Sequence, residues 1–112
     1  MAAMTRLCRL DEVEIGSARG FDPSGCGEDS MFVLRQDGAV RAFENVCPHQ
    51  GVRLEYRKDR FLAADGRSVE CFAHGARFDP VTGACTEGAC EGQSLTPLAC
   101  EIRDDWIWIE SP

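Results

Sequence analysis

Two short stretches, Cys-Pro-His at residues 47–49 and Cys-Phe-Ala-His at residues 71–74, each place a cysteine beside a histidine. The chain has 112 residues and only two histidines, and both lie in these stretches. Thiolates and imidazoles are ligands that proteins offer to zinc and to iron–sulfur clusters. The pattern therefore predicts a metal centre. Its predicted ligands are Cys47, His49, Cys71 and His74.

The order of the ligands favours a binuclear cluster over a single metal ion. A zinc finger supplies its cysteines as one pair and its histidines as another. Here each stretch supplies one of each, so each loop can give one ligand to each iron of a [2Fe–2S] cluster. A structural zinc domain stays open as the alternative, because two thiolates and two imidazoles also satisfy tetrahedral zinc.

Two hairpin signals precede the two stretches. Asp37-Gly38 separates the apolar-rich runs 31–35 and 39–46, and Asp65-Gly66 separates the shorter runs 61–63 and 68–71. Glycine in such a pair accepts the positive φ that a tight hairpin turn requires. We therefore expect each hairpin to deliver one ligand loop.

The remaining pattern predicts short strands and no long helix. In the segment 106–109 tryptophan and isoleucine alternate, which puts both tryptophans on one face of a strand and both isoleucines on the other. We expect the tryptophans to pack in the core or at a sheet edge, and Val33, Phe43 and Val46 to face the core. Short strands with regular turn signals indicate an all-β antiparallel sandwich or barrel, formed by a single domain over residues 1–112.

Charge and composition restrict the partners. The net charge of −7 opposes nucleic-acid binding. It either steers the protein toward a basic patch on a partner or only provides solubility. No run approaches the roughly 18 apolar residues of a membrane span, and residues 1–6 lack the apolar core of a signal peptide. We therefore expect a cytoplasmic protein that does not bind membranes.

Seven cysteines leave five beyond the predicted ligands. Cys8 and Cys100 lie in strand-like runs and are expected to pack as small apolar residues. Cys85 and Cys90 could form a disulfide, replace a lost ligand or pack near the metal centre. Packing near the centre is the simplest interpretation.

Residues 47–51, residues 71–79 and the following Thr82-Gly83 resemble the Rieske [2Fe–2S] proteins, and the chain resembles small soluble Rieske-type ferredoxins from about residue 5 to 110. The resemblance implies an antiparallel β-sandwich or barrel of the Rieske iron–sulfur type, with two cluster-binding hairpin loops. It also implies that Cys47 and Cys71 bind the buried iron, whereas His49 and His74 bind the outer iron.

The implied function is one-electron transfer, with electrons passing from a flavin-dependent reductase to a terminal oxygenase or reductase. The chain is then an electron-transfer component and not an enzyme alone. Pro48, Gln50 and Phe72 would line the docking surface. A small Rieske subunit of a larger, nitrite-reductase-like enzyme is the alternative within the family.

Two residues bear on the reduction potential. High-potential members carry a serine and a tyrosine where this chain has Ala76 and Phe78, so two hydroxyl donors to sulfur are missing. Hydrogen bonds to sulfur stabilise the reduced state. We therefore expect a low potential, on the order of −150 mV.

Overall fold

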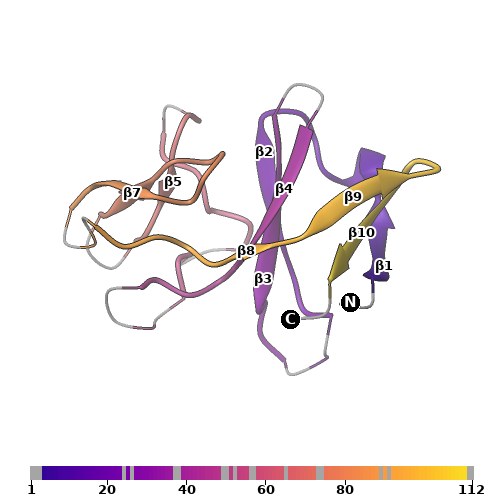
Figure 1. The fold of residues 1–112 in the computed structure, drawn as a ribbon, viewed down its shortest axis with the longest axis horizontal. Coiled ribbons are helices and arrows are strands. Elements are labelled where there is room, and N and C mark those ends of the chain that lie inside the picture. The colour runs from indigo at the N-terminus through magenta and orange to yellow at the C-terminus, as the bar shows by residue number, and fades with distance from the viewer. Residues whose placement is uncertain are drawn as a thin grey trace.

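The computed structural model describes residues 4–23, 25, 27–36, 39–48, 51, 53–55, 58–64, 66–72, 75–88, 90 and 92–110. Their strands form three antiparallel sheets, in the orders β1-β10-β9, β2-β3-β4-β8 and β5-β6-β7. The four-stranded sheet lies between the other two, with β5 and β7 on one side and β1, β9 and β10 on the other (Figure 1). The all-β antiparallel prediction is confirmed.

The first sheet joins the two ends of the described chain. Its strands are β1 (Met4–Arg9), β10 (Trp106–Glu110) and β9 (Cys100–Arg103). The predicted alternation is confirmed, since Ile107 and Ile109 are fully buried. The tryptophans do not face the core. They are partly exposed on the opposite face, where arginine side chains lie over both rings.

The second sheet contains β2 (Ser17–Phe21), β3 (Met31–Gln36), β4 (Ala39–Glu44) and β8 (Pro97–Leu98). In the β3–β4 hairpin Gln36 pairs with Ala39, as the two-residue turn signal predicts. The turn residues themselves lie outside the described part of the chain. Strand β8 has two residues, and both pair with β4, Leu98 with Ala42 and Pro97 with Phe43.

Strand β3 lies between two apolar clusters and contributes side chains to both. Phe32 and Leu34 pack into one cluster, and Met31 and Val33 pack into the other. All four side chains are fully buried, as expected for a strand covered on both faces. The alternation of side chains along one strand thus connects the two halves of the molecule.

The third sheet is built from strands of two or three residues. They are β5 (Val69–Glu70), β6 (Arg77–Phe78) and β7 (Cys85–Glu87). The second predicted hairpin is confirmed by an isolated antiparallel bridge between Leu62 and Val69.

Val46 is a predicted core residue that the structure places at the surface. Its relative exposure is 46%, whereas Val33 and Phe43 are buried. Strand β4 ends at Glu44. Side chains two residues apart share a face, so the buried pair Phe43 and Asn45 leaves Val46 on the opposite, exposed side. Asn45 is the residue that turns inward instead.

Helical structure is minor. The described helical element is the single 3₁₀ turn η1 (Leu10–Glu12). None of the described residues belongs to a helix that is long and apolar enough to span a membrane.

Candidate metal centre

The two cysteine loops begin with the same turn. The N–H of Gly51 donates to the carbonyl of Cys47 over 2.8 Å, and the N–H of Gly75 donates to the carbonyl of Cys71 over 2.8 Å. Both glycines have φ of +70°, which a side chain would strain. The two loops therefore present their cysteines in matching backbone geometry, and one histidine lies between the cysteine and the glycine of each loop.

Both cysteines are buried in the same apolar cluster. Cys47 is 1% exposed and Cys71 is 0% exposed, and the cluster also contains Leu54, Phe61 and other apolar side chains. Two buried thiols in one apolar cluster suit a metal or cluster that takes thiolate ligands. His49 and His74 lie outside the described residues, so their predicted roles stay predictions.

A third loop closes over both cysteine loops. A Cβ added at Gly88 would lie 2.9 Å from Cα of Ala76, so only glycine allows this backbone approach to the second cysteine loop. In the same loop, Sγ of Cys90 lies 3.7 Å from Sγ of Cys47. The third loop therefore contacts each of the other two.

Asn45 connects the two cysteine loops through its side chain. Its Oδ1 accepts from the N–H of Leu54 over 2.9 Å, and its Nδ2 lies 2.9 Å from both carboxylate oxygens of Glu55. The carbonyl of Leu54 in turn accepts from the N–H of Phe72 over 2.9 Å. A chain of hydrogen bonds thus runs from the residue two before Cys47 to the residue directly after Cys71.

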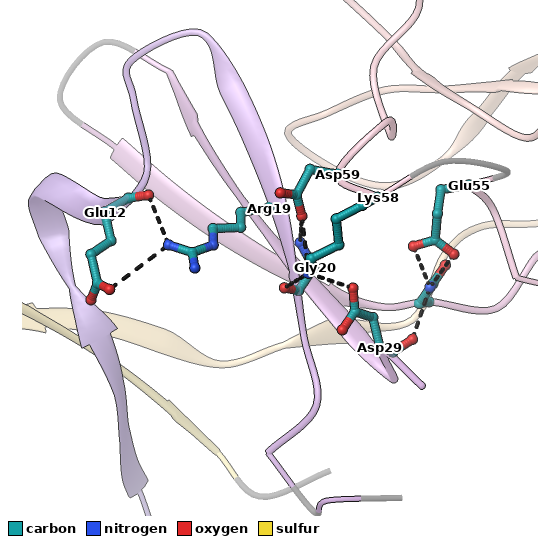
Figure 2. Close-up of polar contacts among 8 residues, drawn as sticks. Glu12, Arg19, Gly20, Asp29, Glu55, Lys58 and Asp59 are labelled. Atoms are coloured by element: carbon teal, nitrogen blue, oxygen red, sulfur yellow. Dashed lines mark hydrogen bonds and ion pairs between the residues drawn. The ribbon is translucent and has the colours of Figure 1, made fainter. Parts of the chain in front are cut away.

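A second polar contact fixes the segment after Leu54 against β2. Lys58 Nζ lies 2.9 Å from the carbonyl of Gly20 and 2.7 Å from Oδ2 of Asp29, and Asp59 accepts from the N–H of Gly20 over 2.8 Å (Figure 2). Figure 2 shows Lys58, Asp59 and Asp29 gathered around Gly20, with Glu55 to their right. A Cβ at residue 20 would lie 2.5 Å from Oδ2 of Asp29, so a larger residue here would displace the carboxylate that Lys58 contacts.

Glu55 is a buried acid at the centre of this network. Burial raises the pKa of its carboxyl above the usual 4.5, although the hydrogen bond from Asn45 and the charge of Arg53 act in the opposite direction. Its relative exposure is only 6%. The network that holds the first cysteine loop therefore contains a group whose charge is costly.

Two residues of the predicted docking surface, Pro48 and Phe72, are described, and both reach the surface of the protein. Phe72 is 51% exposed although it follows a fully buried cysteine, and Pro48 is partly exposed. Gln50 lies outside the described residues. Arg77 forms ion pairs with Glu70 at 3.3 Å and Glu87 at 3.9 Å, so it is held within the third sheet.

The remaining cysteines follow the simplest interpretation. The six described cysteines form no disulfide, and Cys85 donates to the carbonyl of Glu87 over 3.2 Å instead of bonding to Cys90. Cys90 is fully buried beside Cys47. Cys8 is buried between the β1-β10-β9 sheet and the β2-β3-β4-β8 sheet. Cys100 is only partly buried. Cys26 lies outside the described residues.

The sequence predicted that Cys90 packs near the metal centre, but it predicted neither the role of Asn45 nor the direct contact between Cys90 and Cys47. Asn45 is the only asparagine of the chain and lies two residues before a cysteine, a position that could have marked a side chain bonding to nearby backbone. The contact between Cys90 and Cys47 joins residues 43 positions apart. No local pattern predicts such a pair.

Comparison with known proteins gives a consistent answer. The family model described as the Rieske [2Fe-2S] domain matches residues 3–100. The ferredoxin component of the naphthalene 1,2-dioxygenase/salicylate 5-hydroxylase systems of Ralstonia sp is 30% identical over 103 residues, which cover 91% of this chain and 83% of that protein. The ferredoxin of carbazole 1,9a-dioxygenase from Nocardioides aromaticivorans IC177 superposes with a TM-score of 0.77 at 26% identity, covering 98% of this chain and 99% of that one.

A longer relative shares only this part of its length. Methanesulfonate monooxygenase hydroxylase subunit alpha of Methylosulfonomonas methylovora is 29% identical over 116 residues, which cover 88% of this chain but 28% of that protein. The chain therefore spans less than a third of that relative and most of the Ralstonia ferredoxin.

Proposed function

The chain belongs to the Rieske [2Fe-2S] domain family, and we propose that it works as a ferredoxin that transfers single electrons through a [2Fe–2S] cluster. The electrons would come from a flavin-dependent reductase and go to a terminal oxygenase or reductase. The observation that carries this proposal is the match over most of the length of both chains to ferredoxin components of dioxygenase systems.

The donor set fits such a cluster. Cys47 and Cys71 are buried thiols in matching turns, and they are proposed to hold one iron. His49 and His74, which lie in the same two loops, are proposed to hold the other. When bound, the cluster supplies a one-electron redox couple whose potential depends on its ligands and on hydrogen bonds to its sulfurs.

The protein itself supplies position and a dry environment. The matching turns fix the two cysteines, and the apolar cluster around them excludes water. The exposed Phe72 beside Cys71 offers an apolar contact where a partner can approach the centre. Such a surface near the redox centre suits a carrier that must bind two partners in turn and release each.

The extent of the domain and its location belong to the same proposal. We take residues 1–112 as one domain, supported by β3, whose side chains enter both apolar clusters. A cytoplasmic location is supported by the seven cysteines, which suit a reducing compartment. Cooperative unfolding monitored by two probes, and cell fractionation, test these two statements.

The decisive experiment is an EPR spectrum of the purified protein after dithionite reduction, with iron and acid-labile sulfide assayed on the same sample. We expect a rhombic signal with the low average g of clusters bound by two cysteines and two histidines, and about two irons and two sulfides per chain. A colourless, EPR-silent protein with one zinc would overturn the proposal in favour of a structural zinc domain.

The partners need a separate experiment. Affinity purification from native cells tests whether the protein is a carrier that dissociates from its partners or a small subunit of a larger reductase. A free carrier is recovered mainly alone and supports electron flow between a purified reductase and oxygenase. Stable recovery with one large reductase chain would instead establish the subunit.

A further inference from the structure

The thiol of Cys90 lies close enough to Cys47 to interact with it. The two Sγ atoms are 3.7 Å apart, which is within hydrogen-bonding distance for sulfur and too long for a disulfide. Both side chains are buried, with exposures of 0% and 1%. Water therefore does not compete for this contact, and a weak hydrogen bond gains strength in the low dielectric.

Ligation decides which sulfur donates. A cysteine binds iron as a thiolate, which has no proton to give and accepts hydrogen bonds. If Cys47 is a ligand, only Cys90 can donate. We infer that Cys90 is a positioning residue for the redox centre, whose Sγ–H donates to the Cys47 sulfur and raises the reduction potential. This inference rests on the ligand role of Cys47 in the proposed function.

The backbone of the third loop holds Cys90 in place. The carbonyl of Cys90 accepts from the N–H of Gln93 over 2.8 Å, and the carbonyl of Gln93 accepts from the N–H of Cys85 over 2.9 Å. On the other side of Cys90, the close approach of Gly88 to Ala76 fixes the loop against the second cysteine loop. Contacts on both sides of Cys90 therefore hold the backbone that carries its thiol.

The effect on the potential follows from charge. One-electron reduction of a cluster held by Cys47 increases the negative charge on its sulfurs, and the Sγ–H dipole stabilises that charge more in the reduced than in the oxidised state. The proton stays on Cys90 throughout. The contact compensates in part for the hydroxyl donors that are absent at Ala76 and Phe78.

Three substitutions test the inference by EPR-monitored redox titration of the holoprotein. Cys90→Ala and Cys90→Val both remove the donor, and valine also fills the space and keeps water out. We expect each to lower the equilibrium constant for reduction about threefold. This lowers the midpoint by roughly 30 mV, at 59 mV per tenfold change. Cys90→Ser keeps a donor and should hold the wild-type midpoint or exceed it.

Cys85→Ala is the matched control. Its thiol lies in the same loop but donates to the carbonyl of Glu87, so its removal should leave the midpoint unchanged. Wild-type midpoints in the Cys90→Ala and Cys90→Val proteins would overturn the inference, as would an equal drop in Cys90→Ser. The absence of a Rieske signal in the wild-type protein would instead count against the proposed function.

The infrared S–H stretch gives a readout that does not depend on the variants' potentials. The band lost in Cys90→Val belongs to Cys90. In the wild-type protein we expect this band at lower frequency after reduction, because a more negative Cys47 sulfur strengthens the hydrogen bond. A band that does not respond to the redox state would contradict the assignment.

Discussion

The two ends of the molecule are held together by different means. In the sheet β1-β10-β9, ladders of four or five residue pairs join the strands. In the sheet β5-β6-β7, each strand pair contributes only two residue pairs. The short sheet lies beside the cysteine loops, which are joined by a buried hydrogen-bond network centred on Asn45 and by close contacts between loops.

The end with the long ladders is thus distinct from the end that carries the proposed ligands. A long ladder is cooperative and needs little side-chain chemistry beyond an alternating pattern. Loops that bring cysteines from different parts of the chain into one apolar cluster cannot be long ladders. They depend instead on buried polar contacts, glycines at close approaches and, in the proposed function, the bound cluster. The cysteine end should therefore be the more sensitive to single substitutions, in four testable ways.

The largest effect is expected from removing a proposed ligand. Cys71→Ala should reduce the iron content from about two per chain to near zero, because three remaining ligands do not hold the cluster. Amide hydrogen exchange should rise in β5, β6 and β7 while β1 and β10 stay protected. Cys8→Ala is the control, since Cys8 packs in the other apolar cluster and its removal should leave the iron in place. Full iron in the Cys71→Ala protein would exclude Cys71 as a ligand.

The next effect is expected at Asn45. Asn45→Ala leaves the N–H of Leu54 and the Glu55 carboxylate without their shared partner in a buried site, which should cost about 2–4 kcal/mol of unfolding free energy. Chemical denaturation measures the loss. Thr86→Ala removes an exposed side-chain bond and should cost no more than about 0.5 kcal/mol. Equal losses in the two variants would show that the Asn45 network stabilises the protein no more than an exposed hydrogen bond does.

A pH-dependent effect is expected at Glu55. Burial raises the pKa of this carboxyl, so the folded protein holds the proton more tightly than the unfolded chain does. The free energy of unfolding therefore falls as pH rises above the usual 4.5, and the fall ends above the folded-state pKa. The Glu55→Gln side chain cannot ionise, so the variant should not show this decrease in unfolding free energy.

Denaturation curves of both proteins at pH 4 and pH 7 check the sign. The variant should be similar to the wild type at pH 4 and the more stable of the two at pH 7. A variant that is less stable at pH 7 would mean that the charged hydrogen bond with Asn45 outweighs the cost of burial.

The smallest effect is expected at Ala76. This fully buried residue packs against Gly88, between the second cysteine loop and the third loop. Ala76→Ser returns one hydroxyl donor and should raise the midpoint by roughly 30–60 mV. This shift is an increase of about threefold to tenfold in the equilibrium constant for reduction. The exposed Ala84→Ser is the control. An unchanged midpoint with an intact cluster would show that the side chain at residue 76 does not face a sulfur.

Local patterns predicted a large part of this molecule. The pairs Asp37-Gly38 and Asp65-Gly66 correctly placed two hairpins, and the alternation in 106–109 correctly placed the buried isoleucines. Such features depend on residues close in sequence. Val46 was placed wrongly because an apolar side chain does not by itself show which face of the chain it occupies.

The sequence by itself determined that the chain carries two cysteine–histidine stretches, that each follows a hairpin and that the architecture is antiparallel β. Turn preference and the period of two encode these properties locally. Only the tertiary structure decided that Cys47 and Cys71 share one apolar cluster, that Asn45 connects their loops and that Cys90 reaches Cys47. These contacts join distant segments, and packing of the whole chain selects them.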